Sequence, residues 1–271
     1  MIVRHLTLQA LLLTGVVTAA QAGVLIIGTY TGTKTPKGRT VQFRIQDGRA
    51  RITSDPGQVI YYDHAKRTAY IVDTEKKTSF EMTEERAKQV GAQLAEAQKM
   101  MEAKLKELPP EKRAMVEKMM KEQGAGPLPP GGRRPLEFKK AGSDKVGAWS
   151  CDRYSAAGDG RKVDICSAEA ADVGLAADDV AVFEGFLDLS EKMAGEAAGS
   201  SGLGAGPDRG FPGIPLERKE ARDGVVTDRF VIESINQETV AATELQVPAG
   251  LKPVTPPPGP PGPPSKAPAK P

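Results

Sequence analysis

Histidine, cysteine and aromatic residues are scarce in this sequence of 271 residues, which has two histidines, two cysteines and 5% aromatic residues. None of the motifs G-x-S-x-G, S-x-x-K, H-E-x-x-H or G-x-x-x-x-G-K-[ST] occurs. His64 follows Asp63 in a predicted turn, where we expect it to be exposed and to serve the turn rather than catalysis. The triplet at Gly202, Gly204 and Gly206 follows no strand, which argues against a dinucleotide site. The sequence therefore predicts a protein that is not an enzyme and has no cofactor.

Charge of one sign and long apolar runs are also lacking. The 37 Lys and Arg residues nearly balance the 35 Asp and Glu residues, which leaves a net charge of +2. Nucleic-acid binding needs clustered positive charge, so this balance argues against it. No stretch after residue 22 reaches 18 apolar residues, so we expect no transmembrane span in the mature chain.

The first 22 residues have the order of parts of a signal peptide. Arg4 precedes the mostly apolar stretch 6–19, which is short for a membrane span. Ala20-Gln21-Ala22 matches an A-x-A cleavage site, so we predict cleavage between Ala22 and Gly23. The mature protein is then expected to be periplasmic or secreted.

Glycine and proline, 29 and 22 residues, gather in a few segments. They predict flexible loops over about 124–135 and 195–213 and a disordered Pro-rich tail over 253–271. Residues 23–252 are expected to form one domain.

Short alternating segments predict an antiparallel sheet. Val41, Phe43 and Ile45 alternate with polar residues, and Asp47-Gly48 suits a two-residue hairpin turn. A second such turn is expected at Asp223-Gly224. The predicted strands cover 41–46, 49–53, 59–62, 68–72, 78–82, parts of 136–167, 216–221, 225–235 and 239–247.

Three helices interrupt the strands. Thr83 is the expected N-cap of a long amphipathic helix that ends before Pro109-Pro110. Its predicted apolar stripe consists of Ala87, Val90, Leu94, Ala97, Met101, Leu105 and Leu108. A short helix over 111–123 and a second amphipathic helix over 176–193 follow.

Cys151 and Cys166 flank a turn signal at residues 156–160. Placing them opposite each other would also set Arg153 opposite Asp164 and Tyr154 opposite Val163, which are favourable cross-strand pairs. A structural disulfide is the preferred interpretation in an oxidising compartment. A redox or metal-binding dithiol is the alternative, disfavoured by the absence of a C-x-x-C motif.

Methionines cluster in the first two predicted helices, at positions 100, 101, 115, 119 and 120. Thioether sulfurs can bind Cu(I), so a copper-binding protein is one alternative. Packing or the lining of an adaptable apolar groove is the favoured interpretation, because Met-x-x-Met runs with a nearby histidine are absent.

Five short segments resemble a family of secreted bacterial proteins whose fold is similar to that of the lipoprotein carriers LolA and LolB. They are 60–63 (IYYD), 68–73 (TAYIVD), 110–115 (PEKRAM), 146–151 (VGAWSC) and 245–250 (LQVPAG). The resemblance implies an α+β fold: a strongly curved antiparallel sheet, an unclosed β-barrel, with helices on its concave face. The predicted amphipathic helices agree, since a sheet with one apolar face must bury that face.

Two functional hypotheses follow. The first is an exported, non-catalytic binding or carrier protein for a lipid-like or other apolar ligand, such as a lipoprotein acyl chain. Its candidate lining residues are Leu94, Met101, Phe183 and Leu187. The second is a cell-envelope interaction protein with a filled core, whose surface binds a protein partner.

Overall fold

A computed structural model describes residues 22–33, 35–55, 57–122, 136–158, 160–194 and 210–254. The first 21 residues of the predicted signal peptide, the predicted loop at 124–135, most of that at 195–213 and the tail from 255 lie outside the described residues.

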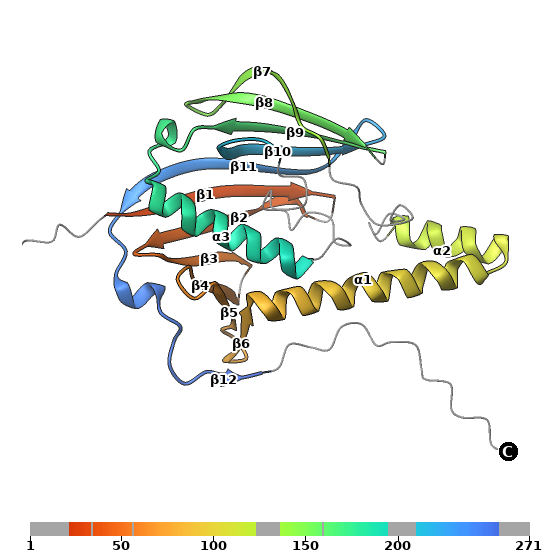
Figure 1. The fold of residues 1–271 in the computed structure, drawn as a ribbon, viewed down its shortest axis with the longest axis horizontal. Coiled ribbons are helices and arrows are strands. Elements are labelled where there is room, and N and C mark those ends of the chain that lie inside the picture. Colours follow the sequence, from red (N-terminus) through yellow and green to blue (C-terminus); the bar gives the residue numbers. More distant parts are fainter. Residues whose placement is uncertain are drawn as a thin grey trace, which may run out of the picture.

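Twelve strands form one open sheet in the order β12-β6-β5-β4-β3-β2-β1-β11-β10-β9-β8-β7 (Figure 1). The strands are β1 (Gly23–Gly32), β2 (Thr35–Gln46), β3 (Arg49–Asp55), β4 (Gln58–Asp63), β5 (Thr68–Asp73), β6 (Thr78–Thr83), β7 (Lys139–Val146), β8 (Trp149–Gly158), β9 (Arg161–Ala168), β10 (Ile214–Arg222), β11 (Val225–Glu238) and β12 (Lys252–Pro253). Every neighbouring pair is antiparallel except β12 and β6. The fold is α+β with an unclosed sheet, as predicted.

The hairpin turns follow the local sequence. Asp47 and Gly48 have φ angles of 50° and 72°, and Asp223 and Gly224 have 50° and 78°. Both pairs therefore adopt the positive-φ turn that connects tightly paired antiparallel strands.

The helices are α1 (Glu84–Glu107), α2 (Pro110–Glu122) and α3 (Ala177–Ala194), with short 3₁₀ turns η1 (Ala171–Val173) and η2 (Ala242–Leu245). Thr83 caps α1 as predicted, since its hydroxyl accepts a hydrogen bond from the Arg86 amide at 3.2 Å. Among the described helices, none is long and apolar enough to cross a membrane.

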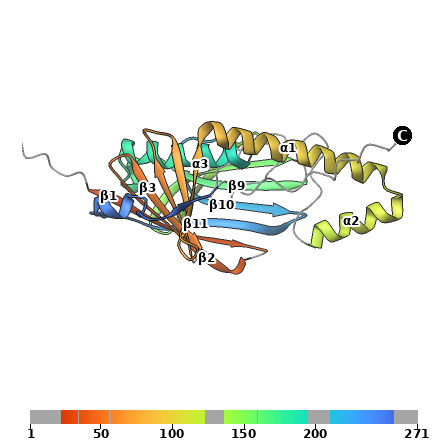
Figure 2. The ribbon, with the colours of Figure 1, turned by 90° about the horizontal axis from the view of Figure 1, so that it is seen from below.

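Helix α3 covers one face of the sheet, called the inner face below (Figures 1 and 2). Phe183 and Phe186 of α3 pack edge-on against Phe43 of β2, with ring centroids 5.2 and 6.2 Å apart. Phe186 also packs against Tyr62 of β4 at 5.8 Å. These rings belong to the largest buried cluster among the described residues.

The sequence predicts that both amphipathic helices cover the sheet, and here it is partly wrong. Only the first turns of α1 pack onto α3 and β6, while the rest of α1 runs past the edge of the sheet and α2 turns back from its end (Figures 1 and 2). The periodicity of a stripe shows which side of a helix is apolar, but it does not show where the covering sheet ends.

The segment 239–254, called the C-terminal strap below, crosses the outer face of the sheet. Its Val240 amide donates to Gln46 Oε1 at 2.9 Å, and its Lys252 amide donates to the Lys77 carbonyl at 2.9 Å. Val247 and Leu251 pack on a second small core formed by Val59, Tyr61 and Val72. The prediction of a strand over 239–247 is therefore wrong, because this segment buries its apolar side chains on the sheet instead of pairing with it.

Cys151 and Cys166 form a disulfide between β8 and β9, with Cα atoms 5.5 Å apart. The predicted register is wrong by two residues: Arg153 lies opposite Cys166, and Tyr154 lies opposite Ile165. The strands close at Gly158 and Arg161, a tighter turn than the five-residue signal suggests. Arg153 pairs instead with Asp144 of β7.

We predict that replacing both cysteines with alanine lowers the free energy of unfolding by about 2–4 kcal/mol. The bridge closes a 15-residue separation and restricts the unfolded chain. Denaturant titration of the oxidised and the double-alanine proteins measures the loss; equal midpoints and slopes would contradict the expectation.

Candidate binding surface

An ion-pair network fixes the start of α1 against α3. Glu84, the first residue of α1, lies 2.8 Å from Lys192 Nζ of α3 and 2.8 Å from Arg67 Nε in the turn after β4. Lys192 also binds Asp188 one turn earlier in α3, at 2.8 Å. The hydrogen bond from Lys192, together with Lys88 and Arg67, lowers the pKa of Glu84 to about 2. The network joins three elements at one point, so it sets the direction in which α1 leaves the sheet.

Gly185 lets α3 approach the sheet next to this network. A Cβ at Gly185 would lie 2.7 Å from both the Tyr62 hydroxyl and His64 Nδ1. Tyr62 is 2% exposed, and its burial raises its pKa. Neither polar atom has a hydrogen-bond partner among the described residues. His64 is thus partly buried under α3 and not exposed as the turn pattern suggests.

One apolar stripe of α1 passes from the core to the surface. Ala87 is fully buried and Val90 packs against the core, whereas Met101 on the same stripe is 43% exposed. The neighbouring Met100 is 38% exposed, and Met115 of α2 is 70% exposed. We call α1 after Leu94, together with α2, the helical arm (residues 95–122). Met100, Met101 and Met115 of the arm are therefore exposed apolar side chains in the described part of the protein.

Arg113 closes the turn between the two helices of the arm. Its guanidinium donates to the carbonyls of Leu105 at 3.0 Å, Lys106 at 2.7 Å and Leu108 at 3.3 Å. The last carbonyls of a helix lack the usual main-chain donors; of these three, that of Leu105 also accepts from the Leu108 amide at 3.3 Å. Pro109 ends α1, and the hydrogen bonds of Arg113 hold the turn between α1 and α2 in one conformation.

The four predicted lining residues do not lie together. Phe183 and Leu187 are buried in the main core between α3 and the sheet. Leu94 is partly buried and Met101 is exposed, both on α1. Two pockets described in the structure lie on the opposite face of the sheet, and none of the four residues lines them. The four residues thus fall in two places: Phe183 and Leu187 in the core, and Leu94 and Met101 along α1.

The described residues contain no group of three or more His, Cys, Asp or Glu side chains arranged to hold a metal ion. His64 faces Tyr62, with ring centroids 6.3 Å apart, and its Nδ1 has no carboxylate partner in the described part of the chain.

No protein-family model matches the sequence, and no curated protein is similar to it. Among solved structures, an uncharacterized conserved protein from Thermus thermophilus is 6% identical, with a TM-score of 0.42 over 86% of this chain and 90% of that chain. The Pseudomonas aeruginosa MucA/MucB complex gives 13% identity and a TM-score of 0.38 over 87% and 59% of the two chains. PNGF-II is 6% identical, with a TM-score of 0.37 over 86% of this chain and 30% of that chain. These likenesses are too distant to support an argument about function.

We predict that Gly185→Ala destabilises the protein by about 1–3 kcal/mol. Alanine in a helix interior is ordinarily favoured by about 1 kcal/mol over glycine, but here its Cβ meets two buried polar atoms. Adding Tyr62→Phe removes one of the contacts and should recover part of the loss in a double-mutant cycle. A higher melting temperature for Gly185→Ala would contradict the close packing.

The lowered pKa of Glu84 predicts acid sensitivity at the base of α1. Its stabilising contribution is complete above the ordinary value of 4.5 and is lost as the pH falls toward 2. Glu84→Gln should flatten this part of the stability–pH curve, whereas Glu85→Gln in the same helical turn should not. Amide hydrogen exchange in α1 at pH 3 and pH 6 measures the effect, and identical curves for wild type and Glu84→Gln would refute it.

Proposed function

We propose that this chain is an exported, non-catalytic binding protein that holds an apolar partner along its helical arm. The observation that carries the proposal is the single stripe of α1, buried at Ala87 and 43% exposed at Met101. A stripe that continues past its cover is apolar surface available to another molecule.

Methionine suits this surface. Its side chain is unbranched and polarizable, so it adapts to apolar partners of different shape. Met100 and Met101 lie on α1 and Met115 on α2, so both helices of the arm present thioethers. Packing against a variable partner accounts for these residues without copper.

The proposed ligand is lipid-like, for example the acyl chain of a lipoprotein. From Leu94 to Leu108 the stripe extends about 21 Å at the helical rise per residue, which exceeds the roughly 15 Å depth of one bilayer leaflet. Leu94 and Met101 are its proposed contacts. Phe183 and Leu187 are left out of this role, because they fill the core beneath α3.

Export to the periplasm or beyond is supported by the signal-peptide pattern of residues 1–22 and by the disulfide. β1 begins at Gly23, so the proposed cleavage after Ala22 would leave the central strand intact.

A protein partner in the cell envelope is the second candidate. It is favoured by the position of the arm, which stands clear of the described sheet (Figure 2) and could pack with a helix of another protein. The interaction would use the same methionines.

Binding of palmitate to the delipidated protein tests the first candidate. We predict that Met101→Glu weakens binding at least about tenfold, because a charge replaces a buried apolar contact. Ala103→Glu adds the same charge at another exposed position of α1 and should bind like wild type. Calorimetry measures the affinity, and circular dichroism checks that both variants are folded.

Absence of palmitate binding to the wild-type protein, together with no lipid adduct in native mass spectrometry, would exclude the lipid-like ligand. The envelope partner would then be tested with a photocrosslinker at position 115. If an envelope protein binds the arm, we expect a single crosslinked adduct in cells. Met101→Glu should abolish this adduct, and Ala103→Glu should retain it.

A further inference from the structure

A row of charged and aromatic side chains crosses the outer face of the sheet, opposite α3. Leu25, Arg44, Arg51, Tyr61 and Tyr70 are successive cross-strand partners from β1 to β5. Directly opposite residues project from the same face of an antiparallel sheet. The pairing therefore places two arginines side by side, next to two tyrosines.

Of the two arginines in this row, Arg44 has a charged partner within the described part of the protein and Arg51 has none. Arg44 has Glu238 at 3.5 Å, but its buried Nε donates no hydrogen bond there. Arg51 is partly buried and forms no ion pair or hydrogen bond with the described residues. Like charges directly opposite each other destabilise a sheet, and here the Arg44 charge is partly compensated by Glu238. An anion bound at Arg51 would compensate the other one.

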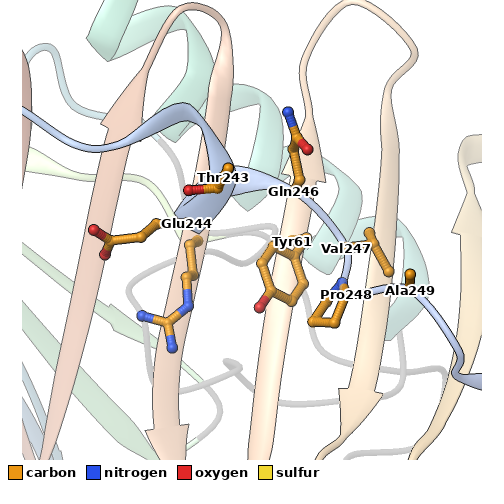
Figure 3. Close-up of a pocket in the computed structure, with 8 residues that line it drawn as sticks. Tyr61, Thr243, Glu244, Gln246, Val247, Pro248 and Ala249 are labelled. Carbon is orange, nitrogen blue, oxygen red and sulfur yellow. The ribbon is translucent and has the colours of Figure 1, made fainter.

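The C-terminal strap turns this row into a groove. A pocket of about 430 Å³ lies between the strap and the sheet, lined by Arg51, Tyr61, Thr243, Glu244, Gln246, Val247, Pro248 and Ala249. Figure 3 shows Tyr61 below the strap, between Gln246 and Pro248, with Glu244 directed away from it. A cavity of this size accommodates a small organic molecule.

We propose that this groove binds a small carboxylate with an apolar or aromatic body, held by the Arg51 guanidinium. The planar fork of arginine matches a carboxylate with two parallel hydrogen bonds. The ring of Tyr61 and the side chains of Val247 and Pro248 offer the apolar contacts. Glu244, which also lines the pocket, disfavours a doubly charged phosphate.

The site is separate from the proposed function of the arm. It lies on the opposite face of the sheet from α3, and its lining residues come from β3, β4 and the strap. A variant that loses acid binding in the groove can therefore still be tested for palmitate binding by the arm, and the reverse also holds.

Two ligands test the proposal: the acid N-acetyl-phenylalanine and its neutral counterpart N-acetyl-phenylalaninamide. Each is titrated into the protein, and binding is followed by NMR. We expect the acid alone to shift the Arg51 guanidinium and the Gln246 amide. Arg51→Gln should weaken binding of the acid about tenfold or more, as expected for a lost charged hydrogen bond. Arg49→Gln, two residues away on the same face and outside this pocket, should bind like wild type.

Thermal unfolding without ligand separates a ligand role from a structural one. Arg51→Gln should keep the melting temperature or raise it by about 1–3 °C, because it removes a like-charge neighbour. A longer acid, N-acetyl-Ala-Ala-Phe, identifies the kind of carboxylate that binds. Tighter binding than that of N-acetyl-phenylalanine indicates the C-terminus of a polypeptide, and equal binding indicates a free acid.

Three results would overturn the proposal. They are equal binding of the acid and the amide, unchanged binding of the acid by Arg51→Gln, and tighter binding of phenyl phosphate than of the acid.

Discussion

The packing of Phe183 and Phe186 in α3 against Phe43 and Tyr62 decides how the rest of the chain is arranged. Edge-to-face aromatic pairs contribute about 0.5–1.5 kcal/mol each beyond the burial of their surface, and here three such pairs share four rings. They seat α3 across the inner face of the sheet. Because α3 carries Asp188 and Lys192, its position also determines where Glu84 and the start of α1 can bind.

A sheet of twelve strands has two faces, and this protein covers them by different means. On the inner face α3 supplies a large apolar surface. On the outer face the strap buries few apolar side chains, chiefly those of Val240, Leu245, Val247 and Leu251, and its ends are hydrogen-bonded to Gln46 and β6. Tyr61 and Tyr62 are adjacent in β4 but belong to these two separate cores. Because the strap covers the outer face incompletely, a groove remains between the strap and the sheet. On the inner face the aromatic rings under α3 pack closely.

The two proposed binding surfaces differ in chemistry for the same structural reason. The arm carries an apolar stripe because α1 continues a stripe that began as core, and the stripe is adaptable because methionine supplies contacts. The groove is polar because its lining includes Arg51 of β3, which forms no ion pair with the described residues. An apolar partner and an anionic ligand would therefore meet different parts of one protein and need not compete.

Local features of the sequence determined much of the fold. The turns at Asp47-Gly48 and Asp223-Gly224, the cap at Thr83 and the end of α1 before Pro109 depend on backbone conformation within a few residues, so the sequence predicts them correctly. The Cys151–Cys166 bridge is correct as a pair. Its register is not, because the turn between β8 and β9 is tighter than its composition suggests.

Contacts between distant segments decided the rest. Apolar residues in 239–247 suit a strand, yet they pack on the sheet because its outer face offers Tyr61 and Val72 as cover. Met101 and Ala87 are equivalent in the helical pattern of α1, and only the extent of the sheet makes one exposed and the other buried. Arg44, Arg51, Tyr61 and Tyr70 come from four strands and share no local signal. They meet in one row because strand pairing, which joins residues far apart in the chain, sets which side chains become neighbours.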